Sequence, residues 1–208
     1  MTARVVVLDY GSGNLRSAER ALARAGADVT VTPDLTEAAA ADGLVVPGVG
    51  AYAACMAGID TLGAAPVIAD RVRAGRPVLG ICVGMQILFD SGEEHGVVTK
   101  GIGLLPGAVT RLDAHRVPHM GWNTVTAPDD SVLFAGLPAD ARFYFVHSYA
   151  ATDTAALTDA GARAITCTHD VPFVAAAERG PLCATQFHPE KSGDAGAALL
   201  RNWVGLLG

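Results

Sequence analysis

One cysteine stands where an apolar run gives way to a helix-like pattern. Cys82 ends the run that starts at Val78, with Gly80 two residues before it and Gly84 two residues after it. This spacing is typical of a nucleophile elbow, a sharp strand-to-helix turn that exposes one reactive side chain. Glycines keep the bend free of Cβ clashes, and the N-terminus of the following helix favours the thiolate. A buried cysteine between packing glycines is the alternative that this motif alone leaves open.

A cysteine nucleophile needs a base, and the base needs a group that orients it. His188 follows the apolar run 182–187, which predicts a histidine at the end of a strand. Pro189 is expected to keep the chain extended, and side chains two apart on an extended chain point the same way. We therefore expect Glu190 to reach the outer nitrogen of His188 and leave the inner one for Cys82. Taken alone, His188 also fits a surface histidine before a turn.

Acyl transfer through a thioester builds negative charge on the former carbonyl oxygen, which backbone N–H groups can stabilise. One donor is expected to be the amide of Val83, directly after the nucleophile. A second is expected at Val49, in the glycine loop (residues 47–50, Pro-Gly-Val-Gly). Because its glycines allow a peptide to flip, this oxyanion hole is expected to assemble only when a partner or substrate requires it. A plain turn is the alternative for this loop.

The pattern of the first half of the chain predicts the sheet that positions these groups. Strand-like apolar runs are expected at 5–9, 27–31, 44–46 and 78–82, and helical patterns at 15–25, 35–41 and within 51–74. Strands that alternate with helices favour right-handed β-α-β units and a parallel sheet. The expected fold class is α/β, flavodoxin-like, with a mostly parallel central sheet flanked by helices.

The second half has a different pattern. Short strand-like runs are separated by turn signals, and they fall at 107–112, 123–126, 143–146, 164–168, 173–177 and 183–186. We expect an added mixed or antiparallel sheet here, followed by a closing helix at 195–207. Since no repeat, low-complexity tract or linker interrupts the sequence, residues 1–208 are predicted to form a single domain.

Composition excludes several classes of function. Half of the 208 residues are hydrophobic, and the formal net charge is −6 without a basic tract, which argues against a nucleic-acid partner. The N-terminal residues lack the pattern of a cleaved leader, and no apolar run approaches the roughly 20 residues that cross a bilayer. A soluble, cytoplasmic protein without a membrane partner is expected.

Neither a metal nor a cofactor is predicted. Cys55, Cys82, Cys167 and Cys183 are too irregularly spaced for a zinc pattern, and in a reducing compartment they are expected to be free thiols. The early run Gly-Ser-Gly at residues 11–13 resembles a dinucleotide fingerprint, but Arg16 stands where its third glycine would fall.

The motifs around Cys82 and His188 together resemble those of the class I (triad) glutamine amidotransferases. Other segments narrow the resemblance to the glutaminase subunits of imidazole glycerol phosphate synthases, enzymes of histidine biosynthesis. These segments cover nearly the whole chain and lie at 9–15, 47–50, 101–105, 118–123 and 143–149. Val83 and Ser12 depart from the residues more common in their motifs, but neither position requires a particular side chain.

The resemblance implies a function and its residues. Cys82 is implied to attack the side-chain amide of glutamine, His188 to protonate the departing ammonia, and Glu190 to orient His188. The residues implied to bind the α-amino and carboxylate groups of glutamine are Gly50, Gln86, Ser148 and Tyr149. Gln86 also suits this role by position, since it lies one helical turn beyond Cys82.

The resemblance also implies a partner, a cyclase with a (β/α)8 barrel, in a heterodimer. Ammonia is implied to pass to the cyclase, which forms imidazole glycerol phosphate and an aminoimidazole carboxamide ribotide. The positions implied near the interface are Trp122, Tyr144, His147 and Lys191.

Three alternatives remain open at this point. One is a glutaminase of another pathway, such as pyridoxal phosphate synthesis, against which the narrower segments argue. Another is a cysteine peptidase or chaperone-like protein on a similar scaffold, which is not expected to carry His-Pro-Glu near its C-terminus. The third is a binding subunit without activity, which the intact Cys82, His188 and Glu190 make an unfavourable interpretation.

Overall fold

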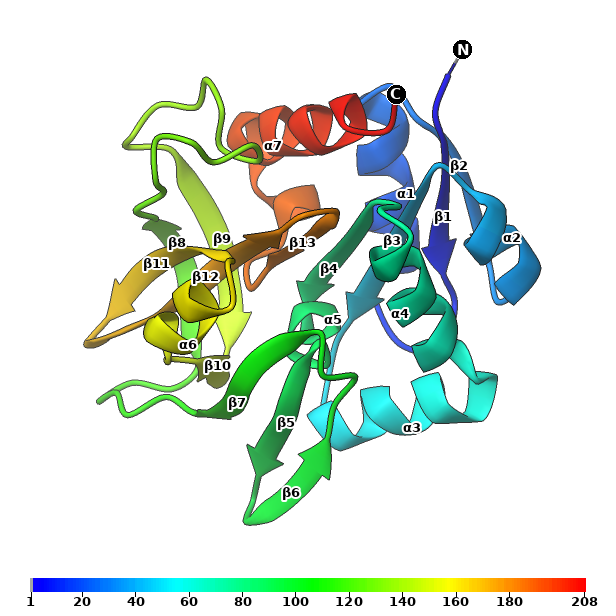
Figure 1. The fold of residues 1–208 in the computed structure, drawn as a ribbon. Coiled ribbons are helices and arrows are strands. Elements are labelled where there is room, and N and C mark those ends of the chain that lie inside the picture. The colour runs from blue at the N-terminus through cyan, green and yellow to red at the C-terminus, as the bar shows by residue number, and fades with distance from the viewer. Residues whose placement is uncertain (1) are drawn as a thin grey trace.

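A central sheet of seven strands organises the chain in the computed structural model, which describes residues 2–208 (Figure 1). Its strand order is β11-β12-β13-β4-β3-β1-β2, and the five strands from β13 to β2 run parallel. The strands are β1 (Arg4–Leu8), β2 (Asp28–Thr32), β3 (Gly43–Gly48), β4 (Val78–Cys82), β11 (Arg163–His169), β12 (Val171–Arg179) and β13 (Leu182–Thr185). The predicted fold class is confirmed.

The helices cover both faces of this sheet. α1 (Leu15–Arg24) leads from β1 to β2, whereas α2 (Leu35–Ala40) takes the chain back across β1 to β3. α3 (Tyr52–Leu62) and α4 (Ala64–Arg73) continue in that direction to β4. Because parallel crossovers are right-handed, the change of direction puts α1 on one face and α2–α4 on the other, as Figure 1 shows. α7 (Gly193–Gly205) packs against α1.

The core lies between the sheet and these helices. Every residue of β3 and β4 is buried, which is why these strands are continuous apolar runs in the sequence without polar alternation. Among residues 2–208, no single helix is long and apolar enough to cross a membrane, and only the sharply bent pair α3–α4 meets that test of length and composition.

One cation is buried at the edge of this core. Arg71 on α4 is 2% exposed, and its guanidinium donates hydrogen bonds to five backbone carbonyls. Four of them lie at the C-terminus of α2 and just beyond it, in residues 38, 39, 41 and 42, and the fifth belongs to Pro77, just before β4. Arg71 therefore satisfies the carbonyls that the end of α2 leaves unpaired and ties them to the start of the elbow strand.

Two smaller sheets lie beside the central one. A mixed sheet of order β10-β7-β5-β6 contains β5 (Phe89–Glu94), β6 (Val97–Lys100), β7 (Leu105–Arg111) and β10 (Tyr149–Ala151). A two-stranded antiparallel sheet contains β8 (His119–Thr124) and β9 (Arg142–His147), and a short helix, α6 (Thr154–Asp159), precedes β11.

The added sheet in the second half is therefore present, but the structure assigns some predicted strands differently. The runs at 164–168, 173–177 and 183–186 were expected in the added layer, and they form β11, β12 and β13 of the central sheet instead. The physical reason is burial on both faces. The stretch 173–177 and all of β13 are inaccessible to solvent, and β13 pairs in parallel with β4.

Candidate active site

Cys82 occupies a strained bend at the end of β4. Its φ of 57° and ψ of −115° are unusual for a residue with a side chain, as expected of a nucleophile elbow. The bend lies against the neighbouring strand β3, since a Cβ on Gly84 would lie 1.9 Å from the Val46 carbonyl oxygen and one on Gly48 would lie 2.4 Å from the Gly84 nitrogen. Only glycine fits at these two positions.

The helix after the elbow is shorter than expected. α5 (Val83–Gln86) is a single turn of four residues, and after Leu88 the chain enters β5. A helix of one turn aligns few peptide dipoles, so it contributes less positive charge at the sulfur than the sequence pattern predicted. Other groups near the sulfur can therefore add to the stabilisation of a thiolate at Cys82.

His188 lies at the same edge of the sheet as Cys82. It follows β13, the parallel neighbour of β4, so both strands end side by side. Its main chain is held on two sides. The His188 N–H donates to the Tyr144 carbonyl at 2.9 Å, and the Ser192 hydroxyl donates to the His188 carbonyl at 2.6 Å. The Tyr144 N–H in turn donates to the Ser192 Oγ at 2.9 Å, which closes the arrangement.

Glu190 contacts the His188 ring, but the backbone that brings it there differs from the prediction. The His188 Nδ1 and the Glu190 Oε1 are 2.7 Å apart, and both side chains are 3% exposed. Residues 189–191 form a 3-10 turn, η1 (Pro189–Lys191), rather than the predicted extended segment. Proline suits the first position of such a turn as well as an extended chain, so its presence alone did not decide between them.

The electrostatics of this pair favour a charged imidazole. Burial disfavours the imidazolium, but hydrogen bonds and attraction from Cys82 and Glu190 outweigh it and raise the pKa of His188 to about 9. With Nδ1 directed at the carboxylate, Nε2 remains for the sulfur. The structure thus brings together Cys82, His188 and Glu190, as the sequence predicted.

The two expected oxyanion donors differ in availability. The Val83 N–H lies in the first turn of α5, where amides have no intrahelical acceptor. The Val49 N–H, in contrast, donates to the Ser12 Oγ at 3.1 Å, and the Val49 carbonyl accepts from the Ser12 hydroxyl at 2.9 Å and the Cys55 thiol at 3.4 Å. In this conformation the Val49 N–H is engaged by Ser12 and is not offered to the site. Tyr10 adds a hydrogen bond to the Pro47 carbonyl.

A cavity of about 250 Å³ opens beside the sulfur. All four residues that the sequence implied for glutamine binding line it, namely Gly50, Gln86, Ser148 and Tyr149, together with Cys82, Val83 and His188. Glu94 also lines it and was missed, because β5 is polar and was not recognised as a strand. Its carboxylate accepts the Tyr52 N–H at 3.0 Å.

The residues expected at a partner interface fall into two groups. Trp122 is 52% exposed and packs edge-to-face against Tyr144 at 5.9 Å between ring centroids, and Lys191 is exposed at the cavity. His147 differs from the expectation, since it is 6% exposed. It points inward and contacts His119, because alternate side chains of β9 face opposite sides.

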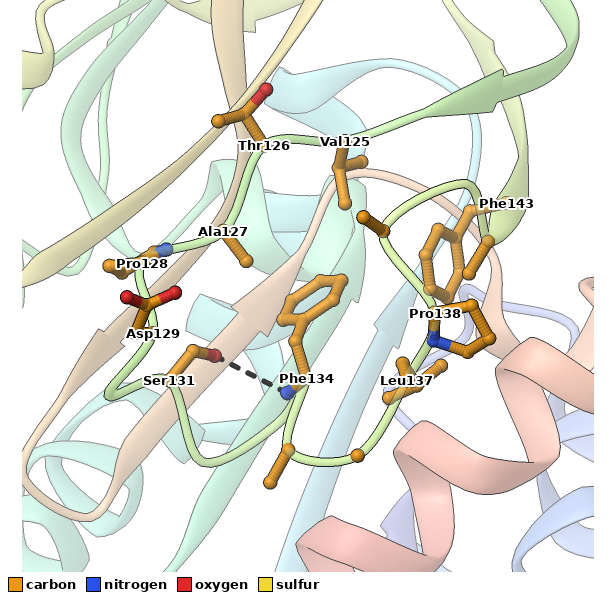
Figure 2. Close-up of a pocket in the computed structure, with 14 residues that line it drawn as sticks. Val125, Thr126, Ala127, Pro128, Asp129, Ser131, Phe134, Leu137, Pro138 and Phe143 are labelled. Carbon is orange, nitrogen blue, oxygen red and sulfur yellow. Dashed lines mark hydrogen bonds between the residues drawn. The ribbon is translucent and has the colours of Figure 1, made fainter.

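A second cavity, of about 390 Å³, lies under the irregular segment between β8 and β9 (Figure 2). Figure 2 shows Phe134, Leu137, Pro138 and Phe143 around it, with the Ser131 hydroxyl accepting the Phe134 N–H. Its lining contains neither cysteine nor histidine. Within residues 2–208, no group of three or more His, Cys, Asp or Glu side chains is placed to hold a metal ion.

Comparison with known proteins identifies the class. The family described as Glutamine amidotransferase class-I matches residues 6–205, and the chain belongs to this family of glutamine-hydrolysing enzymes. Among relatives, the chain is 66% identical over 201 residues to "Imidazole glycerol phosphate synthase subunit HisH" of Mycolicibacterium paratuberculosis, covering 96% of each chain. It is 60% identical over 211 residues to the protein of the same name from Thermobifida fusca, covering 100% of both.

Solved structures agree on the fold. PurLQS from Thermotoga maritima superposes with a TM-score of 0.74 at 19% identity, covering 100% of both chains. The glutaminase domain of Trypanosoma brucei CTPS, solved with bound acivicin, superposes with a TM-score of 0.73 at 17% identity, covering 99% of this chain and 94% of that one.

Proposed function

We propose that this chain is the glutaminase subunit of an imidazole glycerol phosphate synthase and supplies ammonia for histidine biosynthesis. The observation that carries this proposal is the identity of 60–66% with relatives of that name over nearly their full length. The geometry supports it, since Cys82 and His188 line the same cavity and the Glu190 carboxylate is hydrogen-bonded to the His188 imidazole.

The proposed reaction starts with the thiolate of Cys82. Its sulfur attacks the side-chain carbonyl carbon of glutamine, and the developing oxyanion is stabilised by backbone amides. When the C–N bond breaks, His188 gives its Nε2 proton to the leaving nitrogen, which departs as ammonia and leaves a glutamyl thioester. The neutral His188 then takes a proton from water, and the hydroxide attacks the thioester carbonyl carbon. The C–S bond breaks, glutamate leaves with its carboxyl proton lost to solvent, and the Cys82 thiolate and the charged His188 are restored. Glutamine and water are consumed, and glutamate and ammonia are formed.

Gln86 can contribute only one kind of contact to the substrate. Its Nε2 protons are both committed inside the protein, to the Tyr149 carbonyl at 2.9 Å and to the Gln186 Oε1 at 3.0 Å. The Gln86 Oε1 therefore remains for the cavity, and it can only accept. This suits the α-ammonium group of the substrate glutamine. Gly50, Ser148 and Tyr149 then remain to contact its α-carboxylate and its side chain.

Full activity requires the glycine loop to change. Val49 is the proposed second oxyanion donor, yet its amide is bonded to Ser12. Reorienting this peptide breaks that hydrogen bond and aims the N–H at the cavity, with Gly48 and Gly50 absorbing the backbone rotation. We propose that partner binding favours the reoriented form, which makes glutamine hydrolysis depend on the partner.

The proposed partner is a cyclase with a (β/α)8 barrel, bound in a heterodimer in the cytoplasm. Exposed Trp122 on β8 is paired with Tyr144 of β9, exposed Met120 lies two residues earlier on β8, and Val49 is also exposed. Docking over this surface would cover the cavity and pass ammonia directly to the cyclase, which would form imidazole glycerol phosphate and aminoimidazole carboxamide ribotide.

Glutamate release by the purified chain, alone and with the cyclase and its ligand, tests the proposal. We expect little release alone and a large increase in the complex. Cys82→Ser is expected to abolish glutamine use while external ammonia still supports the cyclase. Absence of glutamate release in both states would contradict the glutaminase assignment, and equal release in both would contradict the coupling.

A further inference from the structure

Gln186 is a buried polar residue that contacts the nucleophile. It directly follows β13, is 1% exposed, and its side-chain Nε2 lies 3.9 Å from the Cys82 Sγ. Its main-chain N–H donates to the Ala175 carbonyl at 2.8 Å, which fixes the position of its backbone against β12. Sequence reasoning missed Gln186 because it lies inside the apolar run that precedes His188.

The orientation of the Gln186 amide is determined by its neighbours. A backbone carbonyl can only accept, so the Gln86 atom that lies 2.9 Å from the Tyr149 oxygen must be the nitrogen. The second proton of the same Nε2 goes to the Gln186 Oε1 at 3.0 Å. With its oxygen held by Gln86, the Gln186 side chain must turn its own N–H groups toward the sulfur.

The hydrogen-bond chain continues away from Cys82 to the exposed strand β8. The Tyr149 carbonyl also accepts from the His147 Nδ1 at 3.0 Å. Burial lowers the pKa of His147 to about 3, so this ring is neutral and its Nε2 accepts from the His119 Nδ1 at 3.1 Å. Burial likewise lowers the pKa of His119 to about 4, and its Nε2 accepts from the Asn123 amide at 3.4 Å. In this series of hydrogen bonds, the role of each atom as donor or acceptor is therefore fixed.

We propose that Gln186 is a catalytic residue of this site, whose side-chain N–H, aimed by Gln86, stabilises the Cys82 thiolate before it attacks. An N–H donor to an anion is a charge-assisted hydrogen bond, whereas a carbonyl oxygen at the same place would repel the sulfur. Such a donor adds to the small helix dipole that the short α5 offers the sulfur. The attack on glutamine rests on the proposed function, but the stabilisation of the thiolate does not.

The reactivity of Cys82 toward iodoacetamide tests this proposal without glutamine. The carbamidomethylation rate is measured from pH 5 to 9.5 by mass spectrometry of the peptide that contains Cys82, so that the other thiols do not interfere. Gln186→Glu keeps the acceptor for Gln86 and places a negative charge at the sulfur. Gln186→Met removes the donor at similar size, and Gln86→Met removes the group that aims it.

We expect Gln186→Glu to raise the pH midpoint of alkylation by at least about one unit, which slows the reaction by up to about tenfold at pH values below the midpoint. Gln186→Met and Gln86→Met are expected to raise it by smaller amounts. The remaining charged or titratable groups near Cys82 are the same in all variants. Glu94, His147, Tyr149, His188 and Lys191 lie at the cavity, Glu190 lies against the His188 ring, and Tyr10 and Cys55 lie behind the elbow.

Thr185→Val is the matched control. Thr185 precedes Gln186, is fully buried, and donates its hydroxyl to the Phe187 carbonyl at 3.0 Å. This variant loses a buried hydrogen bond, and we expect lower stability without a change in the midpoint. An unchanged midpoint in folded Gln186→Met would overturn the proposal, whatever the charge in Gln186→Glu does. A chain that releases no glutamate even with the cyclase would refute the proposed function and leave the alkylation result standing, so the two failures are distinguishable.

Discussion

The Ser12 hydroxyl is hydrogen-bonded to both polar groups of the Val49 main chain. It accepts the Val49 N–H at 3.1 Å and donates to the Val49 carbonyl at 2.9 Å. A single side chain thus holds both polar groups of the residue that is the proposed second oxyanion donor. The groups around the nucleophile are therefore in place, whereas the second proposed oxyanion donor is not. Only the conformation of the glycine loop has to change to bring it in.

Ser12→Ala is expected to release this restraint. Loss of a hydrogen bond that contributes about 1 kcal/mol shifts the equilibrium toward the reoriented glycine loop about fivefold. Glutamate release by the chain without its cyclase should rise by about this factor, with little change in the complex. Ser17→Ala, on α1, is the control. Unchanged basal release in a folded Ser12→Ala chain would show that Ser12 does not restrain the loop.

Glu190→Gln is expected to lower kcat about 100-fold in the complex with little change in KM. The carboxylate stabilises the imidazolium that forms on the pathway and holds the ring by Nδ1, and a neutral amide does both less well. Glu93→Gln, at an exposed residue of β5, is the matched control. Equal kcat for both variants would remove Glu190 from the proposed triad.

His188 makes the stability of the chain depend on pH. Burial disfavours its charged form, but Cys82 and Glu190 raise its pKa to about 9, above the ordinary value of 6.5. Its contribution to the free energy of unfolding is therefore complete below pH 6.5 and is lost as the pH rises to 9, by on the order of 3 kcal/mol. Chemical denaturation at pH 6 and pH 9.5 should show a larger decrease for the wild type than for His188→Asn. Parallel decreases would contradict the raised pKa.

Arg71→Met tests the buried guanidinium. It removes a donor from five carbonyls, of which Ala41 keeps the Arg76 guanidinium and Pro77 keeps the Leu44 N–H. We expect a loss of about 3–5 kcal/mol in the free energy of unfolding. Arg73→Met, two residues further on α4, removes an exposed ion pair with Asp70 and is expected to change stability by less than about 1 kcal/mol. Similar losses for the two variants would show that the buried hydrogen bonds contribute little.

Trp122→Ala tests the proposed docking surface. Large exposed aromatic side chains often dominate binding, so we expect the Kd for the cyclase to rise at least tenfold in titration calorimetry. Val98→Ala is the control, since Val98 is 68% exposed on β6, outside the two-stranded sheet that carries Trp122. If Val98→Ala weakens binding and Trp122→Ala does not, the surface has been misplaced.

The sequence was most informative where chemistry demands particular residues. Gly84 is needed for the close approach to β3, and Gly80 for the close approach to the turn after Cys82. Because the strands are parallel, a cysteine at the end of one and a histidine after its neighbour meet at the same edge, so their meeting was predictable. The path from His188 to Glu190 was not, because Pro189 fits a 3-10 turn and an extended chain equally well.

Tertiary context explains the remaining differences. β12 and β13 are buried on both faces by elements distant in sequence, so their place in the central sheet was not visible in local periodicity. β5 has the polar sequence Phe-Asp-Ser-Gly-Glu-Glu, which lacks a strand signal, although it carries Glu94 to the cavity. The hydrogen bond between Ser12 and Val49 joins residues 37 positions apart, which no local pattern indicates.

The hydrogen bonds among Tyr144, Ser192 and His188 determine how a displacement of β9 would reach the active site. The Tyr144 carbonyl accepts the His188 N–H directly. The Tyr144 N–H is linked to the His188 carbonyl through the Ser192 hydroxyl. A displacement of β9 would therefore reach His188 through main-chain hydrogen bonds and not through the side chains of β9. Scanning mutagenesis of β9 with alanine would leave this link intact. Ser192→Ala would cut the branch through the hydroxyl, and chemical synthesis that replaces the His188 amide with an ester would be needed to cut the direct bond to the Tyr144 carbonyl.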